Sequence, residues 1–176
     1  TKAIELEPNN PEHYLLLSQY HQARGDLQEA LRMVENADPS LLENPLIWVD
    51  QAKIYQQMKN IEQAKFCVDR AIDLAGDDIT AMSKAISMSG ILALDSSNPR
   101  EALDYAKASI YLDDGNEEAY TTMSKAYRSL NQPAKAIAAI KKAIKNSKNP
   151  LKLDKQHLSL LKETGEAPEI IEKSAE

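Results

Sequence analysis

A pair of short amphipathic helices with a tight connection is predicted for the stretch from Pro45 to Asp78. Helical spacing places Trp48, Ala52 and Tyr55 on one face of the first helix, and Ala64, Val68 and Ala71 on one face of the second. Two such helices can bury these faces against each other, but a pair of this size cannot cover its outer apolar side. The sequence therefore predicts further copies of the unit on either side.

Small and aromatic residues recur at a fixed distance along the chain. An interval of about 34 residues separates Ala3 from Ala37, Ala37 from Ala71, Ala30 from Ala64, Tyr14 from Trp48, and Ala102 from Ala136. Ala64 and Ala102 lie further apart than this, by an excess of about one helical turn. Because residues 78–94 contain no proline, we place the extra turn in a lengthened first helix of the third unit.

Asn-Pro pairs mark the starts of helices. Asparagine is a favoured N-cap, and proline suits the first helical position because the missing N–H costs nothing there. The pairs are Asn10-Pro11, Asn44-Pro45, Asn98-Pro99 and Asn149-Pro150. A turn of sequence Asp-Asp-Gly-Asn precedes the fourth unit, with Asn116 as its predicted N-cap.

These signals divide the chain into units. Residues 1–10 are the end of a preceding repeat, 11–44 the first repeat, 45–78 the second, 79–116 the third with its extra turn, 117–148 the fourth, and 149–176 a capping helix and tail. The single apolar stripe of Leu153, Leu158 and Leu161 suits a terminal helix with a wet outer face. Because Thr1 opens within a helix pattern, we expect the chain to be part of a longer protein.

Composition favours helix throughout, because glycine and aromatic residues are sparse beside many Ala, Leu, Lys and Glu. Cys67 is the only cysteine, so neither an internal disulfide nor a cysteine-based metal cluster can form. No apolar run approaches the roughly 20 residues of a membrane span. We expect an all-α chain with no membrane span.

The sequence shows no motif for catalysis or cofactor binding. The three histidines lie in different contexts, with none four residues from another, so they offer no metal-binding helix face. The acidic pairs Asp77-Asp78 and Asp113-Asp114 precede helix starts, where carboxylates offset exposed N–H groups. The sequence contains neither a Gly-rich phosphate loop nor a Gly-x-Ser-x-Gly elbow. We predict that the chain is not an enzyme and has no catalytic residue, metal ligand or cofactor.

From Ala3 to about Lys148 the chain resembles the tetratricopeptide repeat family. The family pattern has an aromatic, a leucine, a small residue and a tyrosine on the first helix, and alanines around an aromatic on the second. Matching residues are Trp48, Ala52, Tyr55, Ala64 and Ala71, and again Tyr120, Ser124, Tyr127, Ala136 and Ala143; the departures are Gln51, His21, and Ile86 and Gly90 with the inserted turn. The resemblance implies a right-handed α-α superhelix, a solenoid of tetratricopeptide repeats, with a C-terminal capping helix.

The resemblance also implies a concave groove, lined by the first helices of successive repeats, that holds a peptide or helix of a partner protein. Carried over by position, the groove residues are Leu15, Leu16, Gln19, Val49, Asp50, Lys53, Ser87, Met88, Ile91, Thr121, Thr122, Lys125 and Arg128. The apolar ones are candidate anchors for the partner, or else contacts with an adjacent repeat. A chaperone adaptor with a carboxylate clamp is disfavoured, because only Lys84 fits the clamp positions.

Charge is unevenly distributed along the chain. The segment from Lys125 to Lys162 has ten basic residues and one acid, whereas the rest has 11 basic and 26 acidic residues. We therefore expect a groove that is apolar early and basic late. The leading hypothesis is a non-enzymatic protein-binding scaffold of a larger secretion, transport or complex-assembly system, with an acidic end of the partner near Lys125 and Arg128.

Two alternatives stay open. The first is a structural module for self-assembly or an intramolecular contact. The second is binding of an anionic ligand or nucleic acid by the basic C-terminal third. The negative net charge of −6 and the low arginine and aromatic content disfavour nucleic acid.

Overall fold

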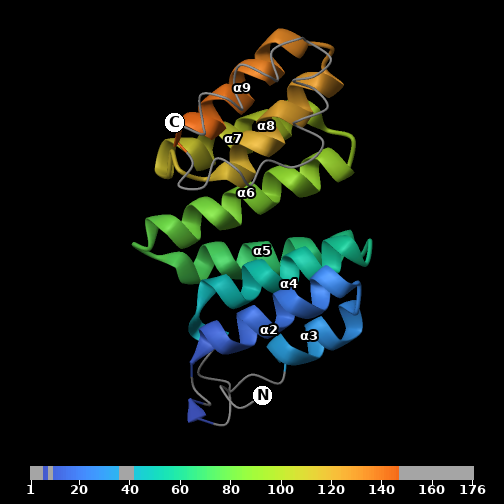
Figure 1. Ribbon diagram of the computed structural model, residues 1–176, viewed down its shortest axis with the longest axis vertical. Coiled ribbons are helices and arrows are strands. Elements are labelled where there is room, and N and C mark those ends of the chain that lie inside the picture. The colour runs from blue at the N-terminus through green and yellow to red at the C-terminus, as the bar shows by residue number, and fades with distance from the viewer. Residues whose placement is uncertain (1–5, 8–9, 36–41, 147–176) are drawn as a thin grey trace, which may run out of the picture.

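The computed structural model describes residues 6–7, 10–35 and 42–146, and within these ranges the regular structure is helical, with no strand. The helices are α2 (Pro11–Arg24), α3 (Leu27–Glu35), α4 (Pro45–Gln57), α5 (Ile61–Ala75), α6 (Ile79–Asp95), α7 (Pro99–Leu112), α8 (Glu117–Ser129) and α9 (Pro133–Asn146). They follow one another along the long axis of the molecule (Figure 1). The predicted all-α helical repeat architecture is confirmed. Throughout the described ranges, no helix has the length and apolar character that crossing a membrane requires.

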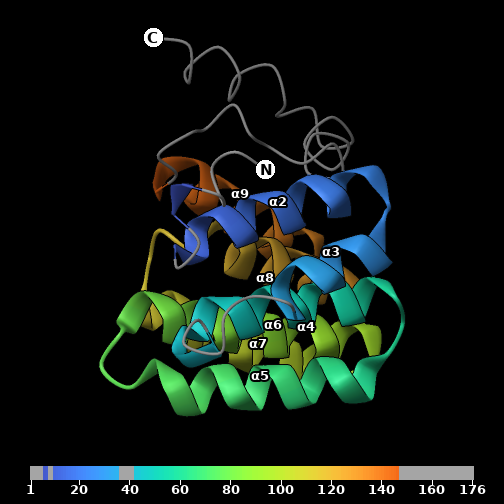
Figure 2. The same cartoon turned by 90° about the horizontal axis from the view of Figure 1, so that it is seen from below.

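Each helix contacts the next one in the chain, and the even-numbered helices also contact one another. The contacts α2 with α4, α4 with α6, and α6 with α8 form a continuous layer. Seen along the stack, α2 and α9 lie toward one side and α5 and α7 toward the other (Figure 2). The stack is therefore curved rather than straight.

Most of the predicted helix starts are capped by the expected asparagines. The side chains of Asn10, Asn44 and Asn116 accept hydrogen bonds from backbone N–H groups of the first turn of α2, α4 and α8. At Asn98 the side-chain amide instead donates to Glu101 Oε2 at 2.7 Å. The fourth pair, Asn149-Pro150, lies outside the described residues, as do the predicted capping helix and tail.

Left-handed residues mark the turn inside each helix pair. They are Gly25, Lys59, Ser97 and Asn131, with φ angles of 80°, 63°, 59° and 56°. The first and third intervals between them are equal, and the second is longer by about one helical turn, as the alanines show in the sequence. Helix α6 accounts for the difference, because it has 17 residues whereas α4 and α8 have 13 each.

Alanines at the helix crossings are fully buried. Ala30, Ala64, Ala102 and Ala136 have no exposed surface, and each belongs to a hydrophobic cluster that joins an odd-numbered helix to its neighbours. A small side chain lets two helix backbones approach closely, so the bulkier side chains around it fill the remaining space.

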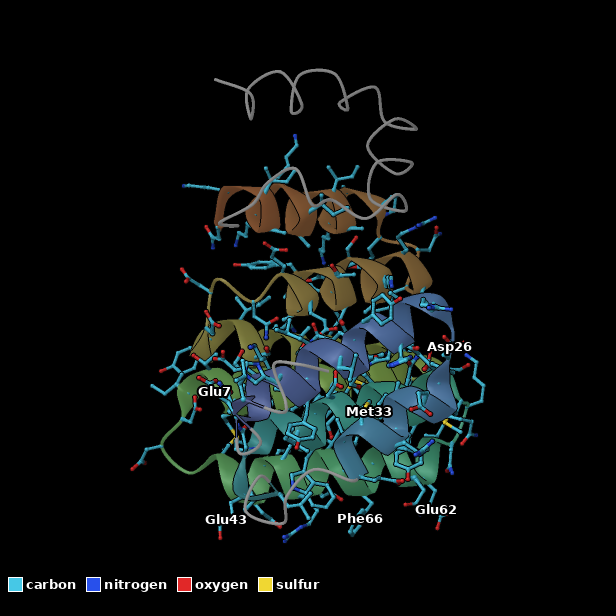
Figure 3. The ribbon with its side chains drawn as sticks, turned by 60° about the horizontal axis from the view of Figure 1, so that its bottom comes forward. Glu7, Asp26, Met33, Glu43, Glu62 and Phe66 are labelled. Atoms are coloured by element: carbon cyan, nitrogen blue, oxygen red, sulfur yellow. The ribbon has the colours of Figure 1, made fainter. Side chains whose placement is uncertain are left out.

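Trp48 is a packing residue on the flank of the stack. Its indole Nε1–H donates to the carbonyl oxygen of Leu42 at 2.7 Å. Phe66 meets the indole edge-on with ring centroids 6.1 Å apart, and Arg70 lies over the indole ring. Phe66 itself is 53% exposed and points away from the stack (Figure 3).

Cys67 lies in the core between α4, α5 and α6, where it packs with Ala52, Ala64 and Met88. Burial raises the pKa of its thiol to about 12. A thiol with a raised pKa is rarely deprotonated, and the thiolate is the nucleophilic form. Cys67 is therefore a structural residue rather than a reactive nucleophile.

Candidate functional site

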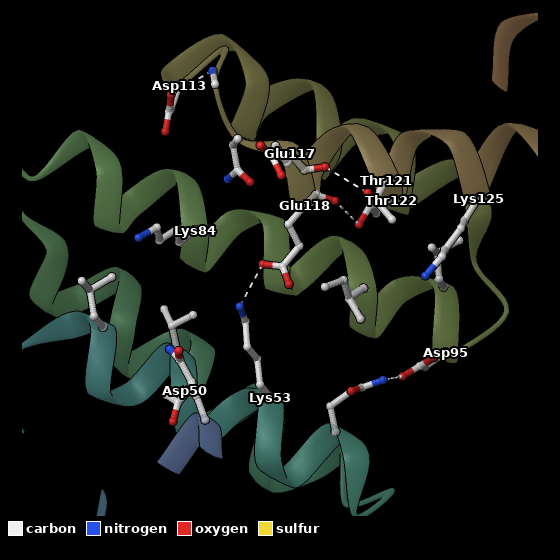
Figure 4. A pocket seen from close by; sticks show the side chains of 18 of the residues that line it. Asp50, Lys53, Lys84, Asp95, Asp113, Glu117, Glu118, Thr121, Thr122 and Lys125 are labelled. Carbon is white, nitrogen blue, oxygen red and sulfur yellow. Dashed lines mark hydrogen bonds and ion pairs between the residues drawn. The ribbon is translucent and has the colours of Figure 1, made fainter. Parts of the chain in front are cut away.

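A groove of about 880 Å³ opens on the layer of even-numbered helices. Side chains from α2, α4, α6 and α8 line it, together with the turn that precedes α8 (Figure 4). These helices come from separate helix pairs, so the groove exists only because the pairs are stacked. Its apolar lining includes Leu15, Leu46, Val49, Ile91 and Leu94.

The structure brings together nine of the thirteen predicted groove residues. They are Leu15, Gln19, Val49, Asp50, Lys53, Ile91, Thr121, Thr122 and Lys125. Leu16 and Arg128 are not among the described residues that line the groove. Both side chains are exposed on the surface outside it.

The solvent-side placement of Ser87 and Met88 is wrong. Both side chains are fully buried, and Met88 packs against Ala52, Cys67 and Leu92 in the core. The physical reason is that α6 contacts α4 on one side and α8 on the other, which leaves only a narrow strip of its surface open. Met88 thus makes the alternative contact, with the neighbouring repeat. Val49, Asp50 and Thr122 line the groove but are also buried, with 4%, 4% and 1% of their surface exposed, so their predicted solvent-side placement is wrong as well.

Sequence reasoning missed the acidic side of the groove. Asp95, Asp113, Glu117 and Glu118 all line it, so its late part is not uniformly basic as expected. The acidic residues near the start of α8 were interpreted only as partners of the helix N-terminus, so their position in the groove lining was not predicted. A usable signal was available, because Glu117 and Glu118 lie one helical turn before the predicted Thr121.

One ion pair crosses the groove. Lys53 Nζ on α4 lies 3.1 Å from Glu118 Oε2 on α8, and the two side chains are 34% and 35% exposed. Helix α6 lies between these two helices, so the ion pair spans the groove over it (Figure 4). An ion pair with this exposure stabilises a fold by about 0.2 to 1 kcal/mol, because water and salt screen it.

Asp50 is a buried carboxyl group beneath the groove surface. The Ser18 hydroxyl donates to Asp50 Oδ2 at 2.5 Å, and Gln22 Nε2 donates to both carboxyl oxygens at 3.1 Å. Burial raises the pKa of this carboxyl group, although the two hydrogen-bond partners and the charge of Lys53 act in the opposite direction. The cluster joins α2 to α4 and holds Lys53, three residues further along, at the groove wall.

A second buried polar cluster fixes the turn before α8. The hydroxyl groups of Ser83 and Ser109 lie 2.9 Å apart, and Asn116 Nδ2 donates to both at 2.9 and 3.0 Å. Asn116 Oδ1 also caps α8 by accepting from the N–H of Ala119. This cluster connects α6, α7 and α8, and it positions the acidic residues that begin α8.

Comparison with known families explains the repeated geometry. The sequence pattern described as "Tetratricopeptide repeat" matches residues 1–32, 46–78 and 117–150, together more than half of the chain. The chain belongs to the tetratricopeptide repeat family. Proteins of this family are generally protein-interaction scaffolds without catalytic activity, and the chain is accordingly a protein-interaction scaffold.

Solved structures of other proteins share the fold. TTC0263, a thermophilic TPR protein of Thermus thermophilus, is 17% identical, with a TM-score of 0.75 over 91% of this chain and 86% of that one. PilF of Pseudomonas aeruginosa is 16% identical, with a TM-score of 0.66 over 98% and 77%. MamA is 19% identical, with a TM-score of 0.57 over 82% of each chain. A search of curated protein sequences gave no significant match.

Proposed function

We propose that the groove binds an extended or helical segment of a partner protein, and that the chain acts as a non-enzymatic scaffold within a larger assembly. One observation carries the proposal: an open groove of about 880 Å³ with apolar and charged side chains from four stacked helices. Apolar side chains that face a groove supply anchors for a partner, while the surrounding charges orient it.

The apolar contacts are assigned to Leu15 and Ile91, which are partly exposed and lie apart along the path from α2 to α6. Such separated contacts suit a chain segment that crosses several helices more than a single compact ligand. Val49 drops out of this assignment because it is only 4% exposed and packs against Ala71 and Ala85 in the core. Lys125 is assigned to an acidic group of the partner, since it lines the groove and is exposed. Arg128 drops out of this assignment because it lies outside the groove lining.

Selection from a library of random linear peptides, followed by affinity measurement, tests the proposal. Lys125→Trp fills the groove, whereas Arg128→Trp makes the same change on the same helix outside the groove lining. Both residues are exposed, so neither substitution disturbs the core. We expect selected peptides to lose about tenfold or more in affinity for Lys125→Trp, because bulk there excludes a ligand segment.

Arg128→Trp should leave the affinity unchanged. Equal effects of both substitutions would contradict a groove site, and so would the absence of any selected peptide. The unfolding transitions of both variants should match that of the unaltered chain, which separates a blocked groove from a damaged fold.

Self-association through α2 is a second candidate. Leu16 and Tyr20 lie one helical turn apart and are 64% and 53% exposed, which gives α2 an apolar outer face. Analytical ultracentrifugation tests this candidate with Leu16→Lys. A concentration-dependent dimer that Leu16→Lys abolishes would support it, and a monomer at all concentrations would contradict it.

A further inference from the structure

The charged residues of the groove form two opposed groups. Lys53 and Lys84 extend from α4 and α6, whereas Asp113, Glu117 and Glu118 lie at the start of α8 (Figure 4). One wall of this part of the groove is therefore cationic, and the facing wall is anionic. The two buried polar clusters described above hold these walls in place.

The Lys53–Glu118 ion pair joins the two walls. Lys53 and Glu118 neutralise each other at 3.1 Å, and their contact occupies the space above α6. Within the described residues, Lys84 forms no ion pair. A chain segment that enters this part of the groove must therefore pass beside the Lys53–Glu118 pair or replace it.

We propose that the groove selects a dipolar segment, which carries a carboxylate and a cationic side chain at opposite ends and replaces the Lys53–Glu118 pair. This inference rests on the proposed peptide-binding function and names the charge pattern of the partner. The carboxylate of the segment pairs with Lys53 and Lys84. Its cation pairs with Glu118 and Asp113.

Charge balance distinguishes a dipolar segment from other ligands. A dipolar segment exchanges one internal ion pair for two intermolecular ones, so neither Lys53 nor Glu118 loses a partner. A segment with charges of one sign can pair with only one wall, and it leaves the other charge covered and unpaired. An uncharged segment that displaces the pair replaces neither half. The cost of leaving a charge unpaired thus lowers the affinity for ligands that do not carry both charges.

A variant in which the ion pair across the groove is reversed tests this proposal. The double variant Lys53→Glu/Glu118→Lys retains an ion pair across the groove but reverses its direction. The probes are a peptide selected on the unaltered chain and a matched peptide in which every acidic residue is exchanged for lysine and every basic residue for glutamate. Their affinities for both forms of the chain are measured by isothermal titration calorimetry.

We expect selected peptides to carry acidic and basic residues at opposite ends. The unaltered chain should bind the selected peptide about tenfold or more tightly than the exchanged one, because the exchanged peptide places like charges against both walls. In the double variant this preference should shrink or reverse. Unfolding measurements should show that the double variant folds as stably as the unaltered chain.

Any of three results would overturn the inference: selected peptides without an order of charges, selected peptides with charges of one sign only, or an undiminished preference in the double variant. If such peptides still respond to Lys125→Trp and not to Arg128→Trp, only the dipolar inference fails. If no peptide is selected, the peptide-binding function fails as well.

Discussion

The junction between α2 and α4 and the junction between α6 and α8 join successive first helices by different chemistry. Between α2 and α4, Asp50 is buried and accepts hydrogen bonds from Ser18 and Gln22. Between α6 and α8, Gly90 lies so close that a Cβ atom added there would be 3.1 Å from Thr122 Cγ2. One repeat framework therefore accommodates a polar junction, sensitive to hydrogen bonding and pH, and a close-packed junction, sensitive to side-chain volume.

Adding volume at the close-packed junction has the largest expected effect. Gly90→Leu should lower the free energy of unfolding by about 3 kcal/mol, because the side chain must displace Thr122, Tyr105 and the backbone of Ala102. Chemical denaturation measures the loss. A destabilisation below about 1 kcal/mol would show that this junction can expand.

A matched pair of substitutions sharpens this test. Gly90→Ala adds only the Cβ atom, and Thr122→Ser removes the methyl group that it would meet while keeping a hydroxyl to donate to Glu118 O. The Gly90→Ala/Thr122→Ser double variant should be more stable than the Gly90→Ala single variant, which retains the methyl group of Thr122. Equal stabilities would show that Thr122 does not limit the approach of α6 to α8.

Removing the carboxyl group of the polar junction comes next. Asp50→Ala should cost about 2 kcal/mol, because it leaves the Ser18 hydroxyl and the Gln22 amide buried without their acceptor. Asp50→Asn retains an acceptor oxygen and should cost less. If Asp50→Ala were neutral, the cluster would not hold α2 against α4.

The same carboxyl group should make stability depend on pH. Because burial raises its pKa in the folded state, the native chain retains the proton to a higher pH than the unfolded chain does. The stability contribution of Asp50 is fully present below the ordinary pKa of 3.8 and decreases as pH rises from there through the raised folded-state pKa. The stability advantage of the unaltered chain over Asp50→Asn should therefore decrease in that range. Thermal unfolding at several pH values measures it, and an increase would contradict the buried state of Asp50.

Substitutions in the turns within the helix pairs should have a smaller effect on stability. Lys59 adopts a φ of 63°, whereas the corresponding turn of the first pair has Gly25 at 80°. Lys59→Gly should stabilise the chain by about 1 kcal/mol, since a side chain is disfavoured in this conformation. Asn131→Gly should gain less, because asparagine tolerates it better. The denaturant midpoints of the two variants show which substitution stabilises the chain more.

The ion pair across the groove should have the smallest effect on stability. A double-mutant cycle with Lys53→Gln and Glu118→Gln should give a coupling of about 0.5 kcal/mol that decreases with added salt. A coupling of about 2 kcal/mol or more would make this pair a structural link comparable to the Asp50 cluster. The proposed replacement by a ligand would then be much more costly.

Helix starts and spacing were predictable because each depends on local signals. Asn10, Asn44 and Asn116 cap helices as expected, and the turn residues follow the alanine intervals. Burial was harder to predict. Met88 shares a helix face with Lys84 and Ile91, yet its own surface is covered by neighbouring helices.

The charge pattern of the groove depends on three-dimensional contacts that the sequence does not express. Lys53 and Glu118 belong to helix pairs that are not consecutive in the chain, so no local periodicity connects them. The buried state of Asp50 likewise depends on Ser18, which comes from another helix pair. Family resemblance placed Asp50 and Lys53 on the groove wall but could not assign their partners.

Methyl NMR of the chain with a peptide selected from the random library tests directly whether the partner binds in the groove. We expect titration to shift the methyl signals of partly exposed groove residues, above all Leu15, Leu46 and Ile91. Ile79, which is 58% exposed and lies outside the groove lining, serves as the control and should not shift. Shifts centred on Ile79, with the groove methyl groups unchanged, would contradict the assignment of partner binding to the groove.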